Sequence, residues 1–219
     1  MTNPLYVFDM DETLINADCA MLWHEFLVEQ GIVTTSDFLE QDKALMALYA
    51  KGEMDMQDYL NFSIAPLSQL NITQVADLAD QCVEEKILPK LFPQAKMLIE
   101  ALHQQKVTML IISASVSFLV TAVAKRIGIQ HAIGIDLVER NCGYTPNILG
   151  TPSYQEGKVV RLQQWNNNQS ESFSEIHFYT DSINDLALCE HADFAYLVNP
   201  CERLVKQAQG TPWQILSWG

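Results

Sequence analysis

The sequence predicts an α/β fold with a parallel sheet and an all-helical insertion after the first strand. Three observations support this prediction. Short apolar runs, rich in β-branched or aromatic residues and without clean alternation, recur along the chain, as in strands buried on both faces. Helical patterns lie between these runs, which favours parallel pairing. Residues 16–91 instead show helical periodicity without a strand signal.

The elements follow in a simple order along the chain. The apolar runs predict strands at residues 5–8, 107–112, 176–179 and 192–198. Amphipathic patterns predict helices at residues 94–104, 116–127 and 155–165. Gly and Pro within residues 141–147 indicate a turn in a short hairpin. We therefore expect residues 1–15 and 92–219 to form one core domain.

The insertion, residues 16–91, is expected to form a separate helical domain. Apolar side chains at helical spacing include Trp23 and Phe26, and Asn71 or Thr73 is expected to cap a later helix. The insertion is acidic and lacks arginine, because the first arginine of the chain is Arg126.

The overall charge limits the classes of partner. The 219 residues contain 13 Lys+Arg against 27 Asp+Glu, a formal net charge of -14. Such a chain is poorly suited to binding nucleic acid, because proteins hold its phosphates mainly with Lys and Arg. It also repels anions at long range, so a phosphorylated ligand requires local cations or a metal.

The cysteines and the N-terminal sequence bear on location. Five cysteines without a CxxC pair suit reduced thiols in a cytoplasmic protein better than a disulfide framework. Acidic residues interrupt the first apolar run, which argues against a signal peptide, and no run reaches the ~20 apolar residues of a membrane span. We expect a soluble cytoplasmic protein without a membrane partner; its oligomeric state is not readable.

Chemically informative residues first appear where the first strand ends. Asp9 and Asp11 stand two residues apart, within the pattern DxDxT that ends at Thr13. Ligands of open α/β sheets bind beyond the carboxyl ends of the strands. Such a pair of carboxylates can bind a divalent cation and divide the roles of nucleophile and general acid/base. The alternative is a solvated acidic loop.

Two further positions could bind a phosphate. Ser113 ends the second apolar run and precedes small residues and a helix, so it offers a hydroxyl beside backbone N–H donors. Lys158, at the opening of another predicted helix, could neutralise a phosphoryl group. Each has an ordinary alternative, a helix N-cap for Ser113 and a solvated cation for Lys158.

The last acidic pair follows the third predicted strand. Asp181 and Asp185 stand four residues apart in the segment DSIND, a spacing that brings side chains onto one face of a helix. Two neighbouring carboxylates repel each other unless a cation lies close by, so a metal site is their natural use. The alternative is a helix cap with a surface carboxylate.

In this order along the chain, these residues resemble the four motifs of the haloacid dehalogenase superfamily of phosphohydrolases. Asp9, Asp11 and Thr13 match the first motif, Ser113 the second, Lys158 the third, and Asp181 with Asp185 the fourth. The segments 150–152 and 198–200 look like the branch related to phosphoserine phosphatase, subfamily IB. The resemblance covers essentially the whole chain, and it implies a Rossmann-like three-layer core with a C1-type helical cap at residues 16–91.

The resemblance also implies a role for each matched residue. Asp9 would be the nucleophile that forms an aspartyl-phosphate, and Asp11 the general acid and base. Mg²⁺ would be held by Asp9, the backbone carbonyl of Asp11, and Asp181. Ser113 and Lys158 would bind the phosphoryl oxygens. Thr13 would support the nucleophile loop and the phosphate, and Asp185 would position the metal waters or Lys158.

These roles predict a phosphatase acting on a small phosphorylated metabolite. Phosphoserine is disfavoured, because the cap lacks an arginine for the substrate carboxylate and Asn16 to Cys19 lack a glutamate. An acidic cap suits an amino-alcohol, histidinol or polyol phosphate, and Asp18, Trp23 and Glu25 are the specificity candidates. A phosphotransferase with the same nucleophile and a non-catalytic binding protein remain as alternatives.

Overall fold

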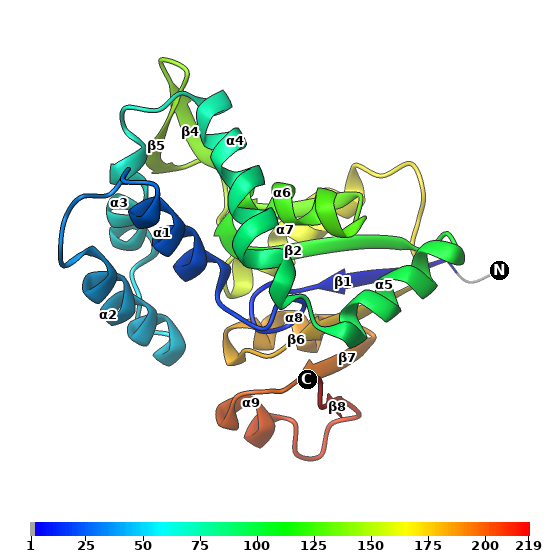
Figure 1. The fold of residues 1–219 in the computed structure, drawn as a ribbon. Helices are drawn as coiled ribbons and strands as arrows, with labels where there is room; N and C mark the ends of the chain where they lie inside the picture. Colours follow the sequence, from blue (N-terminus) through cyan, green and yellow to red (C-terminus); the bar gives the residue numbers. More distant parts are fainter. Residues whose placement is uncertain (1–2) are drawn as a thin grey trace.

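A central parallel sheet organises the chain. The computed structural model describes residues 3–219. Its six-stranded sheet has the order β3-β2-β1-β6-β7-β8, and all neighbouring strands pair in parallel (Figure 1). The strands are β1 (Pro4–Phe8), β2 (Thr108–Val116), β3 (His131–Ile135), β6 (Glu175–Thr180), β7 (Phe194–Val198) and β8 (Gln214–Leu216). The predicted α/β class with a parallel sheet is confirmed.

Helices cover both faces of this sheet. The helices are α5 (Pro93–Gln104), α6 (Ser117–Ile127), α7 (Glu156–Asn167), α8 (Leu186–His191) and α9 (Glu202–Gln207). Side chains of α5 and α6 pack in one apolar cluster with Phe8 and Ile111. Those of α7, α8 and α9 pack in a second cluster with Val7 and Ile112. Because neighbouring strand residues point to opposite faces, the two clusters form the two halves of a three-layer core.

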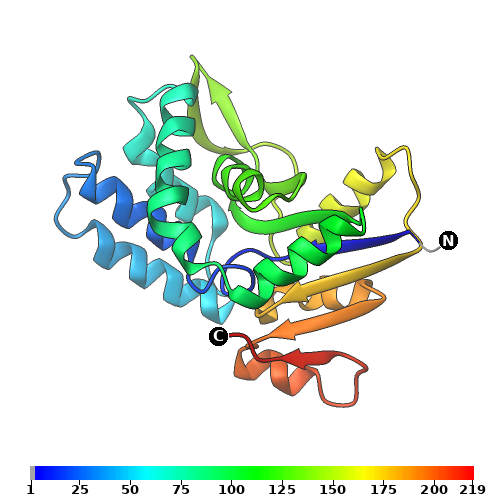
Figure 2. The ribbon, with the colours of Figure 1, turned by 45° about the vertical axis from the view of Figure 1, so that its right-hand side comes forward.

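The chain between β1 and α5 is helical, as the sequence predicts. Its α-helices are α1 (Cys19–Glu29), α2 (Phe38–Lys51), α3 (Met56–Ile64) and α4 (Ile72–Cys82). Asn71 caps α4 in a reciprocal capping box with Gln74. An antiparallel bridge joins Ile15 to Leu91, so the helical segment leaves and re-enters the core at one place. Figures 1 and 2 show these helices beyond the ends of the strands.

The predicted turn at 141–147 lies in a hairpin of β4 (Leu137–Arg140) and β5 (Gly143–Ile148). The hairpin reaches the helical segment directly. Gln57 Nε2 donates to the carbonyl of Pro146 at 2.8 Å, and the Ile72 N–H donates to the carbonyl of Cys142 at 2.8 Å. The hairpin therefore ties the core to α3 and to the start of α4.

Some elements differ from the expectation. Strand β2 continues to Val116, four residues beyond the predicted end, so Ser113 lies inside the strand and α6 begins at Ser117. Strands β3 and β8 and helix α9 are additional, because β3 carries His and Gly within its run and β8 is only 3 residues long. Within residues 3–219, no helix has the length and apolar character needed to cross a bilayer.

Candidate active site

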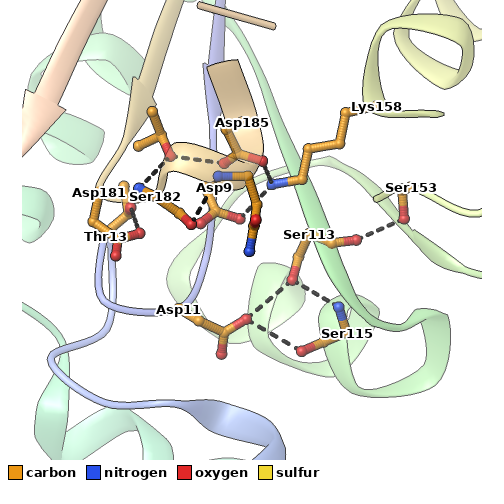
Figure 3. A network of polar contacts seen from close by, with 12 residues as sticks. Asp9, Asp11, Thr13, Ser113, Ser115, Ser153, Lys158, Asp181, Ser182 and Asp185 are labelled. Atoms are coloured by element: carbon orange, nitrogen blue, oxygen red, sulfur yellow. Dashed lines mark hydrogen bonds and ion pairs between the residues drawn. The ribbon is translucent and has the colours of Figure 1, made fainter. Parts of the chain in front are cut away.

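The predicted motif residues converge at the carboxyl ends of β1, β2 and β6. Figure 3 shows Lys158 directed toward Asp9 and Asp185, and the hydroxyl of Ser113 directed toward Asp11, although these residues come from distant parts of the chain. Asp9 follows β1 directly, and its N–H donates to the carbonyl of Tyr179 at the end of β6. Central parallel strands thus bring the motifs together, as expected for ligand sites in open α/β sheets.

Lys158 is the buried cation of this cluster. Its Nζ lies 2.9 Å from Asp9 Oδ1 and 2.6 Å from Asp185 Oδ1, and the residue is only 1% exposed. Burial disfavours the ammonium, but the carboxylates of Asp185 and Asp9 outweigh burial and raise the pKa of Lys158 above its ordinary value. The side chain is therefore a fixed positive charge beside the predicted nucleophile.

Further carboxylates lie close to Asp9. Thr180 Oγ1 donates to Asp185 at 2.7 Å, and Thr13 Oγ1 donates to Asp181 at 3.2 Å. Burial, followed by the charge of Asp185, raises the pKa of Asp181 to about 7. Burial also raises the pKa of Asp9 well above its usual range, although Lys158 lowers it in part. The carboxylates of the cluster therefore exceed the one positive charge that Lys158 supplies.

Asp11 is held by three donors. One carboxylate oxygen accepts from Ser113 Oγ at 3.1 Å and Ser115 Oγ at 3.2 Å. The other accepts from the N–H of Cys19 at 2.7 Å, the first residue of α1. A carboxylate is favoured there by the unpaired N–H groups and dipole of a helix N-terminus. Ser115 is missed by the motif comparison, although its place two residues after Ser113 puts it on the same side of the strand.

The donor set fits a hard divalent cation. The carboxylates of Asp185, Asp181 and Asp11 all lie near Asp9, Lys158 pairs with two of these four carboxylates, and magnesium prefers oxygen ligands. Within residues 3–219, no three His, Cys, Asp or Glu side chains are grouped so that they could hold a metal ion by themselves. Magnesium does not require one, because it usually binds through one or two carboxylates together with water and substrate phosphate.

A cavity lies between the sheet edge and the helical segment, beside Asp11. Its volume is about 50 Å³. Asp18 and Trp23, two of the specificity candidates, line it, whereas Glu25 is not among its lining residues. The cavity also contains residues that the sequence did not single out, including His24, Tyr49 and Tyr59.

Residues 6–190 match the haloacid dehalogenase-like hydrolase family. A histidinol-phosphatase from Neisseria meningitidis serogroup C (strain 8013) is 34% identical over 218 residues, covering 98% of both chains. A solved structure from Bordetella pertussis Tohama I, described as a protein with unknown function, is 30% identical and superposes with a TM-score of 0.89 over 99% of each chain. A substrate-bound phosphoserine phosphatase shares the fold, with a TM-score of 0.69 at 16% identity over 99% of this chain and 93% of its own.

Proposed function

The chain belongs to the haloacid dehalogenase-like hydrolase family, and from that premise we propose that it is a magnesium-dependent phosphatase acting on a small phosphate monoester through phosphorylated Asp9. Relatives named as phosphatases support the activity. The observation that carries the mechanism is the convergence of Asp9, Asp11, Ser113 and Lys158 at one sheet edge.

In the proposed first step, a carboxylate oxygen of Asp9 attacks phosphorus and the bond to the leaving alcohol breaks. Asp11 gives its proton to that alcohol. In the second step, Asp11 takes a proton from water, the water oxygen attacks phosphorus, and the bond to Asp9 breaks to release phosphate. Asp11 suits this double role because it lies beside the cavity that would receive the leaving group.

Three further groups would stabilise the transferring phosphoryl group. Lys158 and Ser113 would bind its oxygens, since both already contact the reacting carboxylates. Asp9, Asp181 and the backbone carbonyl of Asp11 would hold Mg²⁺. When bound, Mg²⁺ supplies the positive charge that this carboxylate cluster lacks.

The experiment is p-nitrophenyl phosphate hydrolysis with and without Mg²⁺, for the wild type, Asp9→Asn and a matched control, Asp58→Asn. Asp58 is an exposed carboxylate in the first turn of α3. We expect Mg²⁺-dependent turnover that falls at least about 10³-fold in Asp9→Asn only. Full activity in Asp9→Asn would exclude the covalent mechanism. Failure of the wild type to bind beryllium fluoride, a mimic of the phosphorylated aspartate, would count against it as well.

We also propose that the leaving group is neutral or positively charged, as in an amino-alcohol, histidinol or polyol phosphate. Asp18 lines the cavity, and the described residues that line it include no Lys or Arg. A substrate carboxylate would therefore lack a cation there. The Neisseria histidinol-phosphatase supports testing histidinol phosphate first. Much faster hydrolysis of phosphoserine than of every amino-alcohol phosphate would contradict this proposal.

A further inference from the structure

Two ionisable side chains form a buried pair inside the helical segment. His24 on α1 and Asp42 on α2 are each 1% exposed, and His24 Nδ1 lies 2.8 Å from Asp42 Oδ1. The angles of this contact are outside hydrogen-bond geometry, and neither atom has another partner among the described residues. Removing both groups from water is costly, and well-packed apolar side chains would avoid that cost. Packing alone therefore does not explain why His24 and Asp42 occupy these buried positions.

Aromatic rings hold the imidazole in place. The ring of Phe38 meets it edge-on at 5.2 Å, and the ring of Phe62 does so at 5.7 Å from another helix. The ring of Tyr59 lies 6.2 Å away, between ring centres. With Asp42 at Nδ1, the position and rotation of the His24 ring are fixed on several sides.

His24 also lines the cavity that contains Asp11 and Asp18. Since Nδ1 faces Asp42, Nε2 is the ring nitrogen left for a ligand. With Nδ1 2.8 Å from the carboxylate of Asp42, the tautomer that carries its proton on Nδ1 is favoured electrostatically, and in that tautomer Nε2 is a hydrogen-bond acceptor. The cavity therefore offers two acceptors, one from Asp18 and one from His24.

We propose that His24, positioned by Asp42, recognises an N–H group on the leaving alcohol, and that the substrate is a phosphorylated amino alcohol bearing an N–H heterocycle such as imidazole. Asp18 would accept from the ammonium, and His24 Nε2 would accept from the heterocycle. Trp23, Tyr49 and Met46 line the same cavity and provide apolar surface for the ring. This inference rests on the proposed phosphatase activity and narrows its substrate class.

The test compares kcat/KM for histidinol phosphate with kcat/KM for 2-aminoethyl phosphate, which keeps the ammonium and lacks the ring. We expect the wild type to prefer histidinol phosphate by at least about tenfold in kcat/KM. In His24→Leu, the ratio of the two kcat/KM values should be about tenfold lower than in the wild type. His24→Gln should retain part of it, because its amide oxygen is also an acceptor.

Asp42→Asn separates positioning from simple packing. The asparagine amide can donate to Nδ1, which moves the ring proton to Nε2 and removes its ability to accept. We expect the ratio of the two kcat/KM values to fall about as far as in His24→Leu, mainly through KM. The double variant, His24→Leu with Asp42→Asn, should have a ratio no lower than that of His24→Leu alone. If His24→Leu does not fold, as judged by circular dichroism, His24→Gln and Asp42→Asn provide the test.

A matched control is His177→Leu. His177 is also a buried histidine beside a carboxylate, with its Nε2 3.3 Å from Glu175, but it lies on β6 and does not line the cavity. Its substitution should leave the ratio unchanged. An unchanged ratio in His24→Leu, or no wild-type preference for the ring, would overturn the inference. Absence of Mg²⁺- and Asp9-dependent turnover on any ester would instead refute the proposed function.

Discussion

At the scale of single residues, Asp18 caps a helix from a buried position that disfavours its charge. It caps α1, where its side chain accepts from the Met21 N–H at 2.9 Å, and it lines the cavity beside Asp11. Burial, followed by the charge of Asp11, raises the pKa of Asp18 to about 7. The ionised carboxylate therefore destabilises the unliganded fold near neutral pH, and the ammonium of the proposed substrate would supply the missing counter-charge.

Asp18→Asn should therefore stabilise the protein in a pH-dependent manner. Asparagine caps helices as well as aspartate does, so the cap is retained while the charge is removed. Because the folded-state pKa of Asp18 is raised, wild-type stability is fully present below pH about 4 and is lost as pH rises through about 7. We expect Asp18→Asn to gain roughly 1–2 kcal/mol in free energy of unfolding at pH 8, after allowance for solvent screening, and almost nothing at pH 4.

Urea unfolding at the two pH values measures this difference. Asp58→Asn, an exposed carboxylate in the first turn of α3, is the control and should gain nothing at pH 8. An equal effect of Asp18→Asn at both pH values would show that the charge of Asp18 is not responsible. The same variant should raise KM for amino-alcohol phosphates, because it removes the proposed partner of the ammonium.

At the scale of elements, the start of α7 decides where Lys158 lies. Gly157 precedes Lys158, and a Cβ added there would meet the carbonyl oxygen of Pro152 at 2.0 Å. The helix can therefore begin this close to the preceding loop only without a side chain at position 157. Arg161, one turn further along, donates to the carbonyl of Thr151 at 3.0 Å and fixes the same loop from the other side.

Gly157→Ala is expected to cost about 2–3 kcal/mol of stability and about tenfold in kcat/KM. The added methyl forces the loop or the helix to move, and a small displacement of Lys158 weakens its hold on the phosphoryl group. Thermal unfolding and p-nitrophenyl phosphate turnover measure the two effects.

Gly150→Ala is the matched control for this prediction. Gly150 has a positive φ of 76°, and an added Cβ would meet nothing within 4 Å. Its substitution should cost about 1 kcal/mol through backbone strain and leave turnover near that of the wild type. Wild-type turnover in Gly157→Ala would show that α7 tolerates the methyl group without moving Lys158.

At the scale of the whole molecule, the net charge of -14 opposes the approach of a phosphorylated substrate. Close to the site, the phosphate is attracted instead, because Lys158 is buried at the sheet edge and the carboxylates beside it can hold a divalent cation. Long-range repulsion and short-range attraction therefore act on the same ligand over different distances. Salt screens the first far more than the second, because buried charges are poorly screened.

Raising ionic strength from about 10 to about 150 mM should therefore increase kcat/KM about twofold or more for dianionic p-nitrophenyl phosphate, with Mg²⁺ saturating throughout. The increase should be smaller for 2-aminoethyl phosphate, whose ammonium offsets part of the phosphate charge. Initial rates at low substrate concentration measure both. A fall in kcat/KM with salt for p-nitrophenyl phosphate would show that local attraction governs the encounter.

The sequence by itself predicted the α/β class and the helical segment after the first strand, and it singled out the motif residues as candidates. Strand runs and helix periodicity are local patterns, and so is the DxDxT pattern that begins at Asp9. A helix cap at Asn71 or Thr73 was also predicted, and the structure places it at Asn71, in a capping box with Gln74. Strands β3 and β8 and helix α9 were not predicted, because each is only 3 to 6 residues long.

The tertiary structure alone decided which side chains share the cavity. Ser115 reaches Asp11 across 104 positions, and His24 finds Asp42 on a neighbouring helix. Trp23 and Glu25 are two residues apart on α1, yet only Trp23 lines the cavity, because the packing of α1 selects one face. Such contacts depend on how helices and strands pack against one another, and no local pattern encodes that arrangement.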